Sequence, residues 1–500
     1  MIKTSINKTL LRSMSELHTW GGLIFGWLLF AIFLTGTLAV FQAELTHWMK
    51  PEFRASQVLP GQALAAADKK LRQIASHADT WTIHLPQKNS PILDVSWKKG
   101  KITLERHLDP LKGAVLKERQ TEGGRFFTDF HSELHSGKAG LWLVSAASLV
   151  MLAALVSGIL IRKRVFKDFF LLRWKRTWLD AHIMTGVFTL PFVLLITYTG
   201  LVLTLMEVMP VSTHLLYENK AKLWTEVGLL SDQKPANVPA ALLPLEQLLP
   251  LAEDLFGKGK IIFVLVKSPG DQQAVVTFIR NTDDRIAAVG DRVSFNGVTG
   301  ELLGIHSKWD PYVYSVRFLA GLHVARFGGY TVAWLYFLAG LIGCIMIAAG
   351  LVFFTVKRRS RYSKSSEAVQ YVYRIIEALN TAAITGIMIA CIAYLWANRL
   401  LPISMKERSD AEITVFFGVW LMTLVHAFWR SPLRAWKEQL AMTAGLCIGL
   451  PIINGLTTKI GLLPAIAQGD WMTASVDLTA LVLGVLLAAA AWRIPAPKLT

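Results

Sequence analysis

The sequence has few charged residues and few cysteines for its 500 positions. Charged side chains make up 17% of the chain and hydrophobic ones 53%, a balance that excludes an ordinary soluble globular protein. The three cysteines all lie inside apolar runs, without the spacing of a zinc site or of an external disulfide framework. The chain also lacks a P-loop, an HExxH motif and a nucleophile elbow, and it has no helix-turn-helix, zinc finger or aromatic–basic platform. These absences exclude the common motif-based hydrolases and predict no nucleic-acid partner.

What the chain has instead is apolar runs long enough to cross a bilayer, which takes about 20 residues. The candidate runs are residues 19–45, 138–161, 181–208, 330–355, 371–398, 412–429, 439–463 and 472–492. The first has an apolar core from Gly21 to Val40, longer than the h-region of about 7–15 residues in a signal peptide, so we expect it to be retained. The sequence therefore predicts an all-α polytopic membrane protein with about eight transmembrane helices in contact with the lipid bilayer.

Basic residues predict the orientation of these helices. Lysine and arginine gather in segments 162–176 and 357–364, and they also occur in the tail before the first run. By the positive-inside rule, both termini face the cytoplasm, and the long loops at about 46–130 and 209–322 face outside. The formal net charge of +17 is then mainly a topology signal. Both loops contain short alternating runs and turns such as "NGVTGELLG" (296–304), which predict two small α+β modules.

The first 355 residues show an internal repeat in parallel orientation. Two apolar stretches, "HTWGGLIFGWLLFAIFLTG" and "HIMTGVFTLPFVLLITYTG", begin with His18 and His182 at the predicted inner side. A second pair, His131 and His323, stands at the predicted outer ends of helices two and four. Glycines keep the same offset from the matching histidine in both copies: Gly22 and Gly186, Gly36 and Gly200, Gly158 and Gly350. Matching offsets in matching topology indicate a duplication.

The repeated histidines indicate cofactor chemistry. An imidazole at a membrane edge is costly unless it has a partner, and the duplication predicts two facing imidazoles at each of two depths. Such pairs suit axial ligation of a haem iron, whereas zinc normally takes three or four protein ligands. The repeated glycines would let a flat macrocycle approach, and they are equally typical of helix–helix packing.

Two further histidines compete for roles on the outer side. His135 follows His131 by four residues, so on a continuous helix it would share a face with it, and either one is a candidate ligand; the repeat offsets favour His131. His306 precedes His323 by seventeen residues and is a candidate for a third outer site or for a substrate contact.

The histidine–glycine frame resembles the PepSY-associated transmembrane helix family of iron-regulated inner-membrane proteins. The resemblance covers residues 10–360 and rests on "LHTWGG", "AHIMTG", "FHSELHSGKAG", "LHVARFGG" and the outer turn "VTGELLG". It implies two b-type haems held by His18, His182, His131 and His323, and periplasmic PepSY-like outer domains. It also implies an oxidoreductase of the bacterial inner membrane that reduces siderophore-bound or other ferric iron at the periplasmic face.

The domain organisation follows from the repeat and the resemblance together. We expect a first transmembrane helix (1–45), a periplasmic PepSY-like domain (46–130), transmembrane helices two and three (131–208), a second PepSY-like domain (209–322), a fourth transmembrane helix (323–360) and a C-terminal four-helix membrane domain (361–500). The last domain does not continue the repeat and is absent from many relatives. It leaves open whether a quinol or a cytoplasmic reductase is the electron donor.

Two other functions fit parts of the pattern. Parallel repeats occur in some carriers, so a transporter of a siderophore or other iron complex is one alternative. A non-enzymatic periplasmic scaffold or peptidase regulator, acting through the outer domains alone, is another. It leaves the intramembrane histidines without a role.

Overall fold

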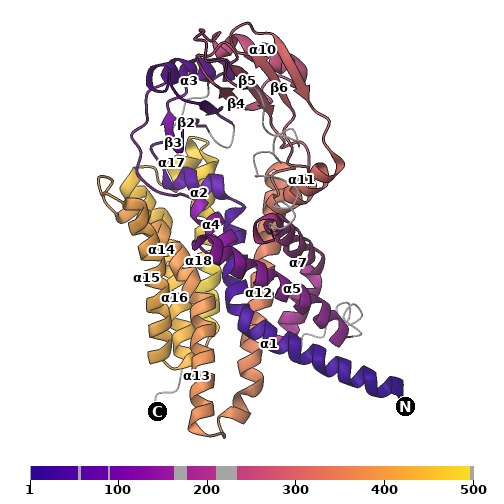
Figure 1. Cartoon of the computed structure of the whole chain (residues 1–500). Helices are drawn as coiled ribbons and strands as arrows, with labels where there is room; N and C mark the ends of the chain where they lie inside the picture. The colour runs from indigo at the N-terminus through magenta and orange to yellow at the C-terminus, as the bar shows by residue number, and fades with distance from the viewer. Residues whose placement is uncertain (1, 54–57, 88–90, 163–176, 210–233, 496–500) are drawn as a thin grey trace. The chain divides into compact units, whose positions relative to one another are not determined.

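The computed structural model describes residues 2–53, 58–87, 91–162, 177–209 and 234–495 (Figure 1). The chain divides into two compact units, and each is described by itself. The membrane unit comprises Met1–Met49, Arg119–Thr204 and Ala333–Thr500, and the sheet unit comprises Lys50–Glu118 and Leu205–Val332. The basic segment 163–176, which contributed to the predicted orientation, lies outside the described residues.

The membrane unit is helical because its sequence offers long apolar runs, and only a helix satisfies every backbone hydrogen bond of a single segment in lipid. Its first part contains α1 (Ile2–Ala39), α2 (Gln42–Met49), α4 (Arg125–Glu133), α5 (Gly137–Ile161), α7 (Trp178–Val208) and α12 (Gly329–Tyr362). Its second part contains α13 (Glu367–Thr381), the π-helical turn η1 (Ala382–Gly386), α14 (Ile387–Leu400), α15 (Arg408–Trp429), α16 (Pro432–Thr458), α17 (Leu462–Ala467) and α18 (Trp471–Arg493). Eight of the described helical segments are long and apolar enough to cross a membrane, which confirms the predicted spans.

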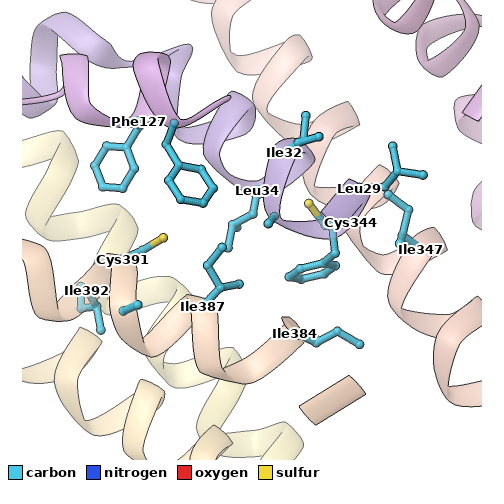
Figure 2. Close-up of a cluster of buried hydrophobic side chains, with 14 of the residues drawn as sticks. Leu29, Ile32, Leu34, Phe127, Cys344, Ile347, Ile384, Ile387, Cys391 and Ile392 are labelled. Atoms are coloured by element: carbon cyan, nitrogen blue, oxygen red, sulfur yellow. The ribbon is translucent and has the colours of Figure 1, made fainter. Parts of the chain in front are cut away.

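The core of the membrane unit joins the repeat to the C-terminal helices. Figure 2 shows Ile32 and Leu34 of α1 beside Cys344 of α12, together with Ile387 and Cys391 of α14. One buried apolar cluster therefore crosses from the first helix of the repeat to the C-terminal domain. All three cysteines are buried and free, as their positions in apolar runs predict.

The sheet unit is built from both long loops. The first loop contributes α3 (Pro60–Ile74), β1 (Thr80–His84), β2 (Leu93–Lys99) and β3 (Ile102–Leu108). The second contributes α10 (Leu245–Phe256), β4 (Ile261–Lys267), β5 (Val275–Arg280), β6 (Arg292–Asn296), β7 (Leu302–His306) and α11 (Pro311–Val324). The two predicted α+β modules are present, and they form one antiparallel sheet in the order β3-β2-β1-β4-β5-β6-β7.

Equivalent strands of the two modules meet at the centre of this sheet. Each module runs helix first and strands afterwards, and the first strands, β1 and β4, pair antiparallel with Thr80 opposite Lys267 and His84 opposite Phe263. Helices α3 and α10 bury apolar residues at helical spacing in the same core, for example Leu64 and Leu71 of α3. Antiparallel pairing of equivalent strands is the arrangement that a twofold relation between the modules produces, which agrees with a duplicated chain.

Candidate functional site

The two predicted inner histidines face each other inside the membrane unit. His18 lies on α1 and His182 on α7, 164 residues apart in sequence. Their ring centroids are 6.0 Å apart, with the ring planes inclined at 68°. The structure therefore brings together the inner pair that the repeat predicts.

Both inner imidazoles are oriented from behind by a backbone carbonyl. Nδ1 of His18 lies 2.9 Å from the carbonyl oxygen of Ala154 on α5, and Nδ1 of His182 lies 2.8 Å from that of Met346 on α12. A carbonyl oxygen only accepts, so each Nδ1 carries the proton and donates. In the neutral form of each ring, Nε2 then keeps its lone pair, which is the state that a metal-binding imidazole needs.

Glycines make room for these contacts. Gly158 and Gly350 stand four residues after the accepting carbonyls, one turn along the same helices. A Cβ at Gly158 would lie 3.2 Å from Cε1 of His18, and one at Gly350 would lie 3.0 Å from Nδ1 of His182. These are the glycines that the repeat offsets single out. Each of them leaves room for a histidine ring that packs against its helix.

The outer histidine His131 is held in the same way. It lies on α4, and its Nδ1 donates to the carbonyl oxygen of Ile32 on α1 over 2.8 Å. Gly36 follows Ile32 by one turn, and a Cβ there would lie 2.6 Å from Nδ1 of His131. Burial lowers the pKa of His131 below its ordinary value, although the bond to Ile32 raises it, so the ring is neutral at pH 7.

Two further glycines of α1, Gly26 and Gly22, differ in what lies beside them. A Cβ at Gly26 would lie 2.8 Å from the side chain of Leu351, which is helix–helix packing between α1 and α12. Gly22, four residues after His18, has no atom within 4 Å of its Cβ position among the described residues. The space beside Gly22 is therefore open on the helix that carries an inner histidine.

The remaining predicted ligand, His323, belongs to the sheet unit. It lies near the end of α11, which terminates at Ala325 in a left-handed conformation. Its pairing with His131 stays a prediction from the repeat.

The expectation that His135 lies one turn beyond His131 on the same helix is wrong. Helix α4 ends at Glu133, and Leu134 and His135 both have positive φ, so the chain turns away before His135. Nε2 of His135 lies 3.0 Å from a carboxylate oxygen of Glu122, so this ring nitrogen already has a partner. His131 and His135 therefore do not share a helix face, and the preference for His131 as the outer ligand stays a prediction.

His306 ends strand β7 and packs edge-on against Trp309, with ring centroids 4.4 Å apart. Its Nε2 is buried and has no hydrogen-bond partner in the part of the chain that the structure describes. Burial and the nearby charge of Arg292 lower the pKa of His306, while Asp291 opposes them. His306 is thus a neutral ring beside a cation, and its role as a substrate contact stays a prediction.

The sequence reasoning missed how the C-terminal helices reach the first repeat. Among the buried polar residues, Trp48 after the first span donates to Asp477 of α18 over 2.8 Å, and Asn454 of α16 donates to the same carboxylate over 2.9 Å. Arg399 of α14 stacks over the Trp48 ring. The signal in the sequence was a set of charged residues at the ends of otherwise apolar runs.

Comparison with known proteins gives one family match. The family described as the PepSY-associated TM region matches residues 15–357, which is more than half of the chain. Among curated proteins, no individual match is found.

Within the described ranges, no group of three or more histidine, cysteine, aspartate or glutamate side chains is placed to hold a metal ion directly.

Proposed function

The chain belongs to the PepSY-associated transmembrane family, and on that premise we propose that it carries electrons across the membrane through two b-type haems to a ferric complex outside. The proposal makes it a haem-dependent ferric reductase of the bacterial inner membrane with both termini cytoplasmic. Siderophore-bound iron is the proposed substrate class. The observation that carries the proposal is the facing pair His18 and His182 with both Nδ1 atoms donating to backbone carbonyls.

The residues present fit a haem. His18 and His182 would hold it, because their rings face each other with centroids 6.0 Å apart and each has its Nδ1 bonded to a carbonyl oxygen, which leaves Nε2 for the iron. Two protein ligands suffice for a haem iron, since the porphyrin supplies the other four nitrogen atoms.

The protein's own contribution is orientation and insulation. The carbonyls of Ala154 and Met346 fix the tautomer and direction of the inner rings, and that of Ile32 does so for His131. A haem bound there supplies one-electron chemistry between ferric and ferrous iron. The surrounding apolar helices exclude water and set the potential through burial.

The spacing of the two seats suits transfer across a membrane. α1 is one continuous helix that carries His18 and, eighteen residues later, Gly36, which lies against the ring of His131. Eighteen residues at about 1.5 Å each span roughly 27 Å, close to the thickness of a hydrocarbon core. The outer pair in this proposal is His131 with His323, and the donor is a quinol or a cytoplasmic reductase.

The test is an absorbance spectrum of detergent-purified protein, first oxidised and then reduced with dithionite, with haem counted per chain. We expect two haems in the wild type and one in each of the variants His182→Ala and His323→Ala. His77→Ala, an exposed histidine of the sheet unit, is the control and should keep both. A colourless preparation, or variants that retain all their haem, would refute the proposal.

Reoxidation of the reduced protein by a ferric chelate is an experiment that distinguishes electron transfer from transport. Reduced protein mixed with a ferric chelate should lose its reduced absorbance bands as ferrous iron forms. Uptake of an intact ferric complex into proteoliposomes, without reduction, would instead support a carrier. Carriers often contain interrupted helices near the membrane midplane, whereas α7 continues through Pro191, which does not favour that alternative.

A further inference from the structure

The segment that leads into α4 is held by the C-terminal helices. Residues 119–124 have no regular secondary structure beyond a turn, so their polar groups need partners elsewhere. Thr121 donates its hydroxyl to Glu412 of α15 over 2.5 Å, and the hydroxyl of Tyr394 on α14 donates to the carbonyl oxygen of Gly123 over 3.2 Å. This segment is therefore bonded to two helices that lie outside the repeat.

A buried ion pair sits at the centre of these contacts. Arg408 and Glu412 pair one turn apart on α15, and neither side chain is exposed to any degree. Arg408 also donates to the carbonyl oxygen of Gln120 over 3.0 Å, and Asn398 donates to Glu412 over 2.9 Å. Burying two charges is costly, so such a pair is better explained by the geometry it specifies than by stability.

One face of helix α4 packs against aromatic rings of the C-terminal domain. Phe126 stacks on Tyr394 with centroids 4.4 Å apart, and it meets Phe416 edge-on at 4.9 Å. Phe130, one turn later, meets Phe416 at 5.4 Å and Trp420 at 6.0 Å. Positions 126 and 130 share a face of the helix, and that face is packed on α14 and α15.

His131 follows Phe130 and contacts α1 through Ile32 and Gly36. α4 is therefore held between α1 on the histidine side and the C-terminal helices on the phenylalanine side. A shift of either support moves the imidazole relative to its carbonyl partner.

We propose that Glu412 and Tyr394 are positioning residues for His131, so that the four C-terminal helices set the geometry of the outer haem site. The inference rests on the proposed haem ligation and deepens it. It assigns these helices a role that does not require them to bind a donor. The inner pair, His18 and His182, receives its orienting carbonyls from α5 and α12 and should not respond.

The experiment compares Tyr394→Phe with Thr121→Val and with both changes together, in full-length haem-loaded protein. Each change removes one hydroxyl and leaves both charged groups of the ion pair in place. Glu412→Gln is the stronger variant, and Thr121→Ser, which restores a hydroxyl, is the rescue. Glu438→Gln on α16 is the matched control, because that carboxylate accepts hydrogen bonds from His426 and Arg430 and, among the described residues, forms none with α4.

The readouts are the low-spin ferric signals in electron paramagnetic resonance and the rate of haem transfer to apomyoglobin. His131→Ala identifies the outer signal and the outer transfer phase. We expect the double variant to move the outer signal and to speed outer transfer about tenfold, the lower end of the effect of removing an orienting partner. The inner signal and inner phase should stay unchanged, and Thr121→Ser should behave as wild type.

Two results would overturn the inference while leaving the proposed function standing: unchanged signals in every variant, or equal changes in both haems, which would show general loosening. A wild-type preparation without two haems would overturn the proposed function and this inference with it.

Discussion

Substituting Gly36, the α1 glycine that lies against the ring of His131, is the sharpest test of how the outer imidazole is held. In Gly36→Ala, the new Cβ lies 2.6 Å from Nδ1 and 2.7 Å from Cε1 of His131, nearer than real Cβ atoms approach other atoms. The methyl carbon is fixed in place by the Cα of α1, because alanine has no rotamer that moves its Cβ. The imidazole ring must therefore move.

The size of the movement follows from the contact distances. To reach ordinary contact at 3.4 Å, the ring withdraws by the difference from 2.6 Å, about 0.8 Å. The distance from Nδ1 to the carbonyl oxygen of Ile32 then grows from 2.8 Å to as much as about 3.6 Å, at which the hydrogen bond is lost. Losing such an orienting partner costs about 10–100-fold in metal affinity, or about 1.4–2.7 kcal/mol at 1.36 kcal/mol per tenfold.

The assay is haem stoichiometry by pyridine haemochrome during titration with free haem. We expect Gly36→Ala to bind one haem as tightly as wild type and the second about 10–100-fold more weakly. Gly445→Ala is the control, because this exposed helical glycine of α16 has no described atom within 4 Å of its Cβ position. Two equally tight haems in Gly36→Ala would refute the reasoning that His131 is seated against α1.

Three further predictions test the inner site, one polar contact and the sheet unit. Gly350→Ala places a Cβ 3.0 Å from Nδ1 of His182, a milder clash, so inner-haem affinity in the same titration should fall by less than tenfold. Asn380→Leu removes the Oδ1 atom that lies 2.7 Å from the indole nitrogen of Trp27, so the indole N–H loses its acceptor. The free energy of unfolding in detergent should fall by about 1–3 kcal/mol, and adding Trp27→Phe should recover most of that loss. Burial raises the pKa of Asp94 to about 6 from 3.8, so the folded sheet binds this proton more tightly than the unfolded chain does. Protection of β2 amides from hydrogen exchange should therefore weaken as pH rises from about 4 to 6, by up to about 3 kcal/mol, and Asp94→Asn should abolish that slope.

The repeat offsets identify the histidines and glycines of the site but not which of them touch. Offsets alone identified His18, His182 and His131, and three glycines with matching spacing proved to seat their rings. The offsets did not reveal which glycine serves which histidine, because the seat lies on a neighbouring helix. Gly158 on α5 serves His18 on α1, a pairing that depends on how the helices pack.

The sequence by itself determined the class of the protein, the eight spans and the candidate ligands, since long apolar runs have one stable form in lipid and a duplication marks equivalent positions. Tertiary structure alone decided the rest. It joined two loop modules into one sheet, turned His135 away from His131, and placed Glu412 and Tyr394 against the segment before α4. These outcomes depend on contacts between residues up to about 290 positions apart, and no local propensity or periodicity encodes such contacts.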